Sequence, residues 1–319
     1  MKKLIITLQA LFLCLMVSAQ TVKFAVITDL HSDIMHDARE RLETFLDAAK
    51  KEKVDFIINL GDFAEVKEKN RPMVELWNSF PGNKYFALGN HDHECSTKEE
   101  YMKFVEMDRN YYSFDKGGIH FIVLDPNFLC IDGEYLPYDK GNFYKERSKR
   151  AHIDLEQAKW LKHDLRNTDK RCVVFSHQSL ENTVSNRTEI RAILEAENQH
   201  AGYQKVVAAF SGHSHTNYEK KINGIAYIQI NSASNHWLGH RFECASRFDE
   251  QINKDYPLIK FVAPYRDCLY AIVKINKHQL KLKGRSSSFI KPTPSEMKVP
   301  QNYGNVPVVA YIKDFCLKF

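Results

Sequence analysis

The chain has few of the cysteines that hold small modules together. It has 7 in 319 residues, and no two of them are separated by only two residues, so a structural zinc finger is not expected. One cysteine lies within the first 20 residues, and the other six allow many disulfide pairings, of which no spacing selects one. Cys172 lies in an apolar, strand-like segment, which favours a buried thiol there.

Long apolar runs are also absent after residue 20, and no later segment is apolar enough for a membrane span. The first 20 residues differ, because two lysines precede an apolar stretch over residues 4–17 and two small residues follow it. This layout is typical of a signal peptide, so we expect export to the periplasm or the extracellular space after cleavage. A membrane anchor is the alternative, but Gln9 interrupts a stretch that is shorter than about 18 residues.

A strong excess of either charge is missing. The 45 Lys and Arg residues against 40 Asp and Glu give a formal net charge of +5, and loss of the two leader lysines lowers it to +3 (5 − 2). No basic stripe is present, so a nucleic-acid partner is not expected. Internal repeats and low-complexity linkers are absent too. We therefore expect one domain over residues 21–319, and the sequence does not indicate its oligomeric state.

Short apolar segments alternate with helical patterns over the first two thirds of the chain. Strands are predicted over residues 22–28, 54–60, 84–88, 171–176 and 205–211, and a pair joined at Gly117-Gly118. Leu42, Phe45 and Leu46 mark one face of a helix, and a second helical segment surrounds Val74. This alternation predicts a layered α/β sandwich.

Several local patterns indicate where elements begin and turn. Ser96 with Glu99, and Asp154 with Gln157, match the cap patterns at which helices begin. Turns within residues 220–230 and 268–284 predict hairpins, so the C-terminal part should be rich in β structure and end in a hairpin extension. The tail from residue 286 shows little periodicity. Residues 126–150 form a polar insertion, which we expect to overhang a site.

Polar side chains follow five of the predicted strands directly. In an open α/β sheet, ligands bind beyond the carboxyl ends of the strands, so these side chains should meet at one edge. In chain order they are Asp29 and His31, then Asp62, then Asn90, His91 and Asp92, then His177, and finally His213 and His215.

The donor types in this set indicate a metal centre. Carboxylates, imidazoles and one amide oxygen suit Mn, Fe, Zn or Co. A glycine before Asp62, Asn90 and His213 lets the backbone turn tightly beside the site. The donors are too many for one tetrahedral ion, so we expect two ions that share a carboxylate. A lone aspartate after a strand is more simply a turn former or a helix cap, and a lone histidine a surface or core residue. Their joint occurrence at five strand ends favours the metal.

In order, the motifs D-x-H, G-D, G-N-H-D, a separate H and G-H-x-H resemble those of the calcineurin-like metallophosphoesterases, over residues 22–230. The resemblance implies a four-layer α/β/β/α sandwich and a dinuclear centre of divalent or trivalent ions. It assigns Asp29, His31, Asp62 and His215 to one ion, and Asp62, Asn90, His177 and His213 to the other. It also makes His91 a catalytic group that does not bind the ions and is oriented by Asp92.

The same resemblance implies a metal-dependent hydrolase of a small phosphate ester. Two cations about 4 Å apart would activate a bridging hydroxide for in-line attack on phosphorus. His91 would stabilise charge or protonate the leaving oxygen. Phosphodiesters are slightly favoured; the alternatives are an acid-phosphatase-like phosphomonoesterase, a non-catalytic scaffold and a dinuclear amide hydrolase. A non-catalytic scaffold should lack at least one metal ligand, and this chain lacks none. Asn90 as a ligand and the G-N-H-D motif argue against the amide hydrolase.

One position departs from a related pattern. Purple acid phosphatases of this superfamily carry a tyrosine ligand three residues after the bridging aspartate, but Glu65 occupies that position here, so a tyrosinate–iron chromophore is not expected. Candidates for substrate contact are Tyr135, Tyr138, His236 and Trp237, although loop aromatics are more often packing residues. His93 is a candidate support for the ligands, and a solvent-facing loop histidine is its alternative.

Overall fold

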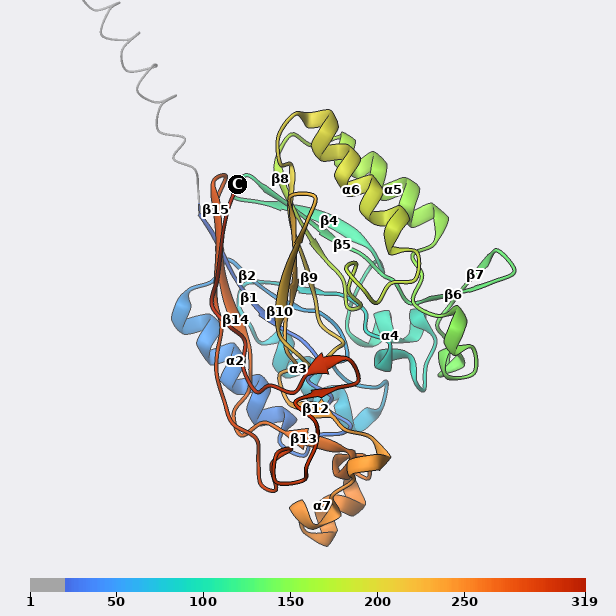
Figure 1. Cartoon of the computed structure of the whole chain (residues 1–319), viewed down its shortest axis with the longest axis vertical. Helices are drawn as coiled ribbons and strands as arrows, with labels where there is room; N and C mark the ends of the chain where they lie inside the picture. Colours follow the sequence, from blue (N-terminus) through green and yellow to red (C-terminus); the bar gives the residue numbers. More distant parts are fainter. Residues whose placement is uncertain (1–20) are drawn as a thin grey trace, which may run out of the picture.

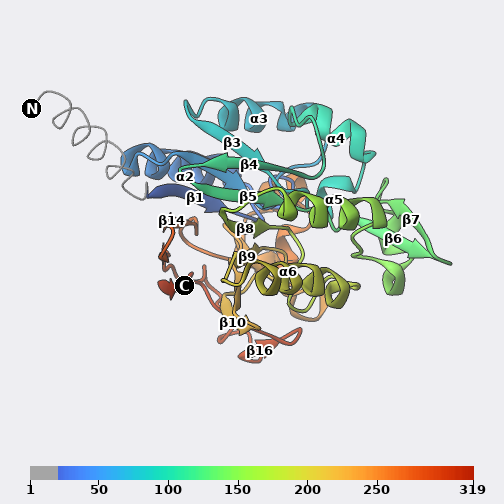
Figure 2. The ribbon, with the colours of Figure 1, turned by 90° about the horizontal axis from the view of Figure 1, so that it is seen from above.

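The computed structural model describes residues 21–319, and the expected signal peptide over residues 1–20 lies outside them. Every helix among residues 21–319 is too short or too polar to span a bilayer. The remaining chain forms two six-stranded sheets with helices on their outer faces. Figure 2 shows α2 and α3 on one side and α6 on the other, with the strands between them.

The first sheet contains the earliest strands and the C-terminal ones. Three parallel strands lie at one side of it, and the C-terminal hairpin joins antiparallel to the first strand of the chain. The order is β18 (Phe315–Lys318), β15 (Gln279–Lys283), β14 (Ala271–Ile275), β1 (Val22–Ile27), β2 (Phe56–Asn59) and β3 (Asn83–Phe86).

The second sheet is parallel at its centre and antiparallel at both edges. The order is β10 (Tyr218–Ile222), β11 (Ile225–Gln229), β9 (Val206–Ser211), β8 (Arg171–Phe175), β5 (Ile119–Val123) and β4 (Tyr112–Lys116). The predicted turns are confirmed: Gly117-Gly118 joins β4 to β5, and Asn223-Gly224 joins β10 to β11 with positive φ at both residues. Such a pair of φ angles matches the right-handed twist of a hairpin.

The helices cover the outer faces of the sheets, which completes four layers. The first sheet is covered by α2 (Ala38–Glu52) and α3 (Arg71–Asn78), and the second by α5 (Leu155–Arg166) and α6 (Arg187–Ala201). Apolar side chains on one face of each helix make these contacts, as the predicted periodicity of Leu42, Phe45 and Leu46 in α2 requires. The four-layer α/β/β/α prediction and the β-rich C-terminal portion are confirmed.

Phenylalanine rings fill the space between the two sheets. Phe24 of β1 stacks on Phe56 at 4.9 Å and meets the edges of Phe121, Phe175 and Phe210 at 5.7–6.0 Å, all of them fully buried. Burial of one such side chain contributes roughly 1.5–3 kcal/mol. Because rings from both sheets interdigitate, this layer fixes the relative position of the strand ends that carry the polar residues.

One of the two predicted helix caps differs from the structure. Helix α4 (Lys98–Phe104) begins one residue later than predicted: its cap is Thr97, which accepts from the Glu100 N–H, while the Glu100 carboxylate accepts from the Thr97 N–H. Ser96, the predicted cap, instead donates to the carbonyl of Asp92. The helix at Asp154 is as predicted, with its carboxylate accepting from the Gln157 N–H.

The polar insertion over residues 126–150 is more ordered than a loop. It forms a hairpin of β6 (Phe128–Ile131) and β7 (Glu134–Pro137), which projects from the body of the molecule (Figure 1), and two short helical turns, Asn142–Tyr144 and Arg147–Lys149. Leu129, Tyr138 and Phe143 give it a small core of its own.

The last third of the chain adds several short helices and strands. They are β12 (Asn235–Trp237), α7 (Glu250–Asp255), β13 (Val262–Pro264), β16 (Asn302–Tyr303) and β17 (Val306–Pro307). The six cysteines of the described part are all free, and Cys172 is buried in β8 as predicted.

Candidate metal centre

The polar side chains predicted from the strand ends do come together. Asp29 and His31 follow β1, Asp62 follows β2, His177 follows β8, and His213 and His215 follow β9. Hydrogen bonds between the turns hold the strand ends in place: the Asp29 N–H donates to the Gly61 carbonyl at 3.0 Å, and the Gly212 N–H donates to the His177 carbonyl at 2.9 Å. Both sheets therefore contribute to one site.

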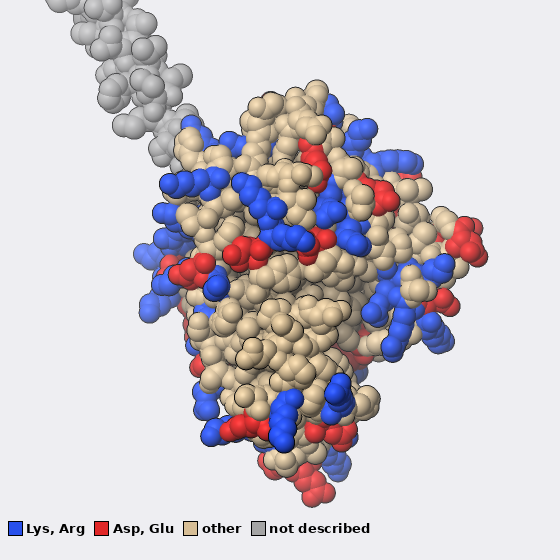
Figure 3. Space-filling model, viewed as in Figure 1, with Lys and Arg blue, Asp and Glu red and all other residues tan. Residues whose placement is uncertain are grey.

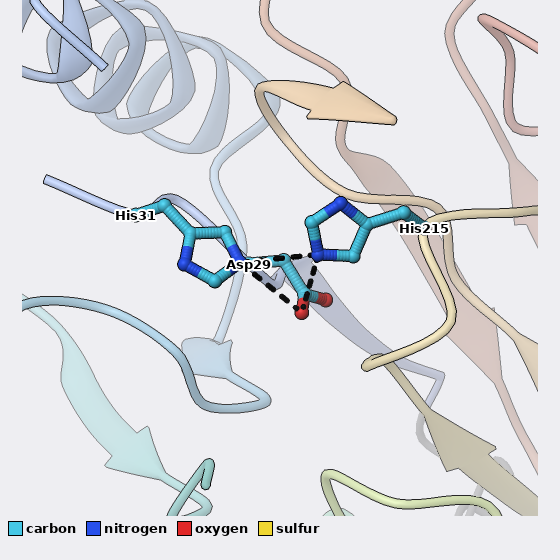
Figure 4. Close-up of side chains that lie close together, drawn as sticks. All are labelled: Asp29, His31 and His215. Atoms are coloured by element: carbon cyan, nitrogen blue, oxygen red, sulfur yellow. Dashed lines mark hydrogen bonds and ion pairs between the residues drawn. The ribbon is translucent and has the colours of Figure 1, made fainter. Parts of the chain in front are cut away.

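Asp29, His31 and His215 form the first group of possible ligands (Figure 4). His215 Nε2 lies 3.2 Å from Asp29 Oδ1 and 3.1 Å from His31 Nε2, and His31 Nε2 lies 3.8 Å from the same carboxylate oxygen. All three are buried. Three donor atoms that face one point without protein between them form a site that one cation can fill.

Asp62, His177 and His213 form the second group. His177 Nε2 lies 3.1 Å from Asp62 Oδ2 and 3.2 Å from His213 Nδ1. The same Asp62 oxygen lies 3.9 Å from His31 Nε2, a member of the first group. Asp62 thus lies between the two groups, where a carboxylate shared by two ions is expected.

Asn90, the remaining predicted ligand, is buried, and its side-chain oxygen finds no hydrogen-bond partner within residues 21–319. A buried carbonyl oxygen without a partner costs free energy, and coordination of a cation removes that cost. Together the residues offer imidazole nitrogens, carboxylate oxygens and one amide oxygen, a set that fits two first-row metal ions.

The backbone is strained at five of the seven predicted ligands. Positive φ angles occur at Asp29 (52°), His31 (53°), Asp62 (54°), His213 (74°) and His215 (46°). A non-glycine residue in this region costs on the order of 1–3 kcal/mol and persists only where its surroundings hold it. Such a concentration of strain marks the site as functional rather than as a set of ordinary turns.

Two glycines allow the turns to approach the carboxylates. A Cβ at Gly89 would lie 2.1 Å from Asp62 Oδ1, and a Cβ at Gly212 would lie 2.7 Å from Asp29 Oδ2 and 2.0 Å from Thr28 Oγ1. Neither clash is tolerable, because real Cβ contacts are never so short. The glycines predicted to permit tight turns therefore permit close packing around the ligands.

Hydrogen bonds on the far side of two histidines fix which nitrogen faces the site. The Nδ1–H of His177 donates to the Leu60 carbonyl, and that of His215 donates to the Asn235 carbonyl, both at 2.8 Å. Each ring therefore presents the lone pair of Nε2 to its group. Backbone carbonyls behind metal-binding imidazoles commonly play this part.

Burial and mutual contact shift the pKa values of these ligands, and in His31, His213 and Asp62 the shift favours the state that binds a cation. Burial lowers the pKa of His31 and of His213 to about 3, so both rings are neutral at pH 7. Burial alone would raise the pKa of Asp62, but His177, His91 and His31 together outweigh it and hold the pKa well below its usual range. Burial lowers the pKa of His177, while the charge of Asp62 raises it to about 9. A cation between these two groups would take the place of that proton.

The structure corrects the expected environment of His91. Asp92 does not contact its ring; the Asp92 carboxylate instead accepts from the N–H groups of Asp62, Phe63 and Gly89, at 2.8–3.1 Å. Asp92 is therefore a positioning residue that ties together the turns after β2 and β3. Its carboxylate is committed to backbone donors because three N–H groups converge on it, which residue spacing does not reveal.

Glu94 holds the His91 ring instead. The Glu94 carboxylate accepts a short hydrogen bond from His91 Nδ1–H and another from the Tyr144 hydroxyl, whose oxygen lies 3.4 Å from His91 Nδ1. The His91 ring lies 5.3 Å from that of His31. Burial lowers the pKa of His91, but Asp62 and Glu94 raise it to about 9, so the ring can hold a proton beside the ligands.

The remaining aromatic and histidine candidates differ in whether they line the cavity over the ligands. Tyr138 is buried and its hydroxyl accepts from the Ala151 N–H, so it is a packing residue rather than a substrate contact. Tyr135 does not line the cavity described below, whereas His236 and Trp237 do. His93 is not solvent-facing: it is fully buried, and neither ring nitrogen has a hydrogen-bond partner within the described residues.

A cavity of about 800 Å³ opens over the two groups. The insertion reaches it, as predicted, and so do segments near residues 237, 258 and 303. Its lining includes His31, Asp62, His91, Asp92, Glu94, Tyr144, Arg147, Arg150, His213, His215, His236, Trp237, His240, Leu258 and Tyr303. The ligand groups therefore form the floor of a chamber large enough for an organic molecule.

Solved structures with the same fold include an enzyme and an anchor protein. A dimetal phosphatase from Danio rerio is 13% identical, with a TM-score of 0.58, and the match covers 85% of this chain and 99% of that one. GAP50, the anchor in the inner membrane complex of Plasmodium, is 16% identical, with a TM-score of 0.51 and 86% of each chain covered. No curated protein matches the sequence. At these identities the likeness shows the fold alone.

The sequence itself matches a family model, that of the calcineurin-like phosphoesterases, over residues 22–217. This region contains all seven predicted ligands and His91, and the predicted resemblance is confirmed. The chain belongs to the calcineurin-like phosphoesterase family and is a metallophosphoesterase, a hydrolase of phosphoric ester bonds.

Proposed function

We propose that this centre hydrolyses small phosphate esters with the help of two metal ions, and that phosphodiesters are slightly preferred over monoesters. The observation that carries the proposal is the position of Asp62. Its Oδ2 lies 3.1 Å from His177 in one ligand group and 3.9 Å from His31 in the other, at the floor of the cavity. Two bound cations would neutralise phosphoryl oxygens there and lower the pKa of a water molecule.

The residues of the chain have distinct parts in this proposal. Asp29, His31, Asp62 and His215 would hold one ion, and Asp62, Asn90, His177 and His213 the other. His91 is bonded through Nδ1 to Glu94, so Nε2 is the nitrogen that remains to donate a proton to the leaving oxygen. Asp92 keeps the turns after β2 and β3 in register around the site.

Cavity size supports the preference for diesters. A volume of about 800 Å³ is far more than a phosphate group occupies, and side chains from two separate parts of the chain line it beyond the ligands. A diester places an organic group on each side of the phosphorus, which such a chamber accommodates. The alternative is a phosphomonoesterase. A monoester carries one organic group, so it would leave the other side of the cavity filled with solvent.

A scaffold without catalysis is a less favoured candidate. GAP50, which shares the fold, is described as an anchor. Every proposed ligand is present in this chain, and five of them keep a strained backbone, which a scaffold has no reason to maintain. We also propose that the protein is exported, on the pattern of residues 1–20; N-terminal sequencing of secreted protein should then begin near residue 20.

Turnover of a substrate panel tests the activity. Purified protein, stripped of metal, is supplied separately with Mn, Fe, Zn, Co or Mg and offered matched phosphomonoesters and phosphodiesters. Metal-dependent phosphate or alcohol release, with higher kcat/KM on diesters, supports the proposal. Higher kcat/KM on monoesters selects the alternative, and no release with any metal favours the scaffold.

A further inference from the structure

Side chains beyond the ligands divide the cavity lining into two chemically different walls. Arg147 and Arg150, from the end of the insertion, form what we call the arginine wall. Trp237, Leu258 and Tyr303, from the last third of the chain, form what we call the aromatic wall. The two walls differ in charge and polarity, so each favours a different chemical group of a bound substrate. Together they indicate which groups that substrate carries.

The arginine wall presents unpaired positive charge. Arg147 and Arg150 are exposed, and neither guanidinium contacts a carboxylate or another hydrogen-bond acceptor within residues 21–319. Lysine and arginine side chains gather over this segment, which follows β7 (right side of Figure 3). Guanidinium groups bind phosphate and carboxylate oxygens with paired hydrogen bonds, so this wall suits an anion.

Carboxylates in the same lining do not neutralise these arginines, because they are already paired. Asp33 lies 3.1 Å from Lys69 Nζ, and Glu65 lies 2.8 Å from Lys67 Nζ. Glu94 is engaged by the His91 ring and a tyrosine hydroxyl. Asp92, the remaining carboxylate of the lining outside the ligand groups, is buried and accepts from three backbone N–H groups. The exposed charge that remains free to contact a substrate is therefore positive and lies on the arginine wall.

The aromatic wall presents apolar surface that nothing in the described chain covers. Within residues 21–319, six large hydrophobic side chains are exposed, and three of them, Tyr144, Trp237 and Leu258, line this one cavity. Trp237 is 44% exposed and Leu258 39%. Exposed apolar surface that is concentrated in a concave site marks a place for an apolar ligand group.

Trp237 is held at a fixed position relative to the ligands. Its backbone pairs with Val262 of β13, and its ring lies 6.3 Å from that of Phe261. The preceding residue, His236, is buried, and its Nδ1–H donates to the carbonyl of the ligand His215 at 2.9 Å. A rigid indole is well suited to contact a flat ring because little side-chain entropy is lost on binding.

Tyr303 brings the C-terminal tail into the same wall. Its hydroxyl donates to the Leu238 carbonyl at 2.9 Å, and its ring meets that of Phe242 at 5.3 Å. The whole aromatic wall lies beyond residue 217, where the match to the family model ends. The wall therefore lies outside the part of the chain that the family model describes, where residues that determine substrate choice can vary without changing the ligand groups.

From these two walls, and resting on the proposed function, we propose that the preferred substrates are phosphate esters that carry both a flat apolar group and a second anionic group. The flat group, such as an aryl ring or a nucleobase, contacts Trp237, Leu258 and Tyr303. The second anion, a phosphate or a carboxylate, is held by Arg147 and Arg150. Simple alkyl phosphates carry neither a flat apolar group nor a second anion, so they contact neither wall.

Three phosphonates test the walls separately, because the P–C bond is not hydrolysed. Methylphosphonate is the baseline, phenylphosphonate adds a ring, and phosphonoacetate adds a carboxylate. Their dissociation constants are measured by calorimetry on the metal-loaded protein, and each is expressed as a ratio to that of methylphosphonate. Trp237→Ala should reduce the preference for phenylphosphonate by about tenfold, and the double variant Arg147→Gln/Arg150→Gln should reduce that for phosphonoacetate by about tenfold.

Matched substitutions outside the cavity serve as controls. Leu136→Ala removes an exposed hydrophobic side chain and Arg109→Gln an exposed arginine, and both should leave the two ratios unchanged. Leu258→Asn tests the aromatic wall a second time. Ratios that stay at the wild-type value in the Trp237, Leu258 and arginine variants overturn the proposal of two walls.

The two proposals fail in different ways. If esters are hydrolysed but the ratios do not respond, the walls are wrong and the phosphoesterase activity stands. If the ratios respond as expected but no ester is hydrolysed with any metal, the binding preference stands and the proposed activity is wrong.

Discussion

At the residue scale, His91 is the side chain whose role is easiest to separate from metal binding. The two ligand groups are complete without it, and its ring is held by Glu94. His91→Ala should therefore keep its metal content and lose kcat by about 10²–10⁴-fold, the usual contribution of general acid–base assistance. An alkyl ester should suffer more than a nitrophenyl ester, whose leaving group needs no proton.

Metal analysis and kinetics on both leaving groups check this prediction. Loss of an ion from His91→Ala would make the residue a ligand. Equal losses on the two esters would remove the proton-donor role and leave only charge stabilisation.

Glu94 should act through His91, as a positioning residue. Glu94→Ala removes the acceptor that holds Nδ1–H, so we expect kcat to fall by about tenfold, with KM and metal content little changed. Glu94→Gln keeps an acceptor oxygen and should restore most of the activity. Glu99→Ala, an exposed change nearby in α4, is the control. If Glu94→Ala turns over at the wild-type rate, this positioning role is wrong.

Sequence patterns predicted which residues gather in the two candidate metal groups, but not what supports His91. The gathering was predictable because each residue follows a recognisable strand, and strand ends of a parallel sheet meet by topology. The contacts of Glu94 and Tyr144 with His91 were not predictable. Tyr144 is 53 residues from His91 in the chain and reaches the site only through the fold of the insertion. The motif placed Asp92 beside His91 in sequence, while its carboxylate faces three backbone N–H groups.

At the element scale, the cap of α4 provides a test of the corrected helix boundary. Thr97→Ala removes the hydroxyl that accepts from the Glu100 N–H, so we expect a loss of about 1 kcal/mol in the free energy of unfolding. Ser96→Ala removes only a 3.4 Å bond to the Asp92 carbonyl and should cost less. Urea denaturation measures the free energy of unfolding of both variants. A larger loss of stability in Ser96→Ala than in Thr97→Ala would contradict this helix boundary.

The sequence left this boundary ambiguous because Ser96–Glu99 and Thr97–Glu100 both match a capping box. Tertiary contacts select the second. With Thr97 as cap, the buried Lys98 contacts the Asp125 carboxylate and donates to the Asn127 carbonyl at 3.1 Å. A buried ion pair of this kind tolerates no shift of one residue, since the lysine would lose its partner.

His120 joins three elements and should make their stability depend on pH. Its ring lies between Asp115 of β4 and Asp164 of α5, each at 2.8 Å. Burial lowers the pKa of His120, but the two carboxylates outweigh it and raise the pKa above its usual value. This stabilisation is fully present below the unfolded pKa of about 6.5 and disappears as the pH rises through the folded value.

His120→Gln should therefore lose more stability relative to wild type at pH 6 than at pH 9. Urea denaturation at the two pH values measures the difference. A loss that is the same at both pH values would show that the ion pairs contribute nothing and that only packing is affected.

At the scale of the whole molecule, the alternation of strand and helix patterns predicted a layered α/β sandwich and the family resemblance implied its four layers. The strand at the far C-terminus was not predicted. Residues 315–318 add β18 to the first sheet, and Ala310, Ile312 and Leu317 lie in the core between the sheets. Such short segments carry too few residues for a period to appear, and only pairing with β15 makes them strands. The aromatic wall was likewise only partly predictable, because Leu258 and Tyr303 line the same cavity as Trp237 through tertiary structure alone.

Asp62 is proposed to be shared by two metal ions, and the metal content per chain is the measurement that decides whether it is. Wild-type protein, loaded and then dialysed, should retain two ions per chain by mass spectrometric metal analysis. Asp62→Asn removes the shared negative charge, so it should retain at most one ion and lose metal-dependent ester hydrolysis. Retention of two ions by Asp62→Asn at wild-type affinity would contradict the account.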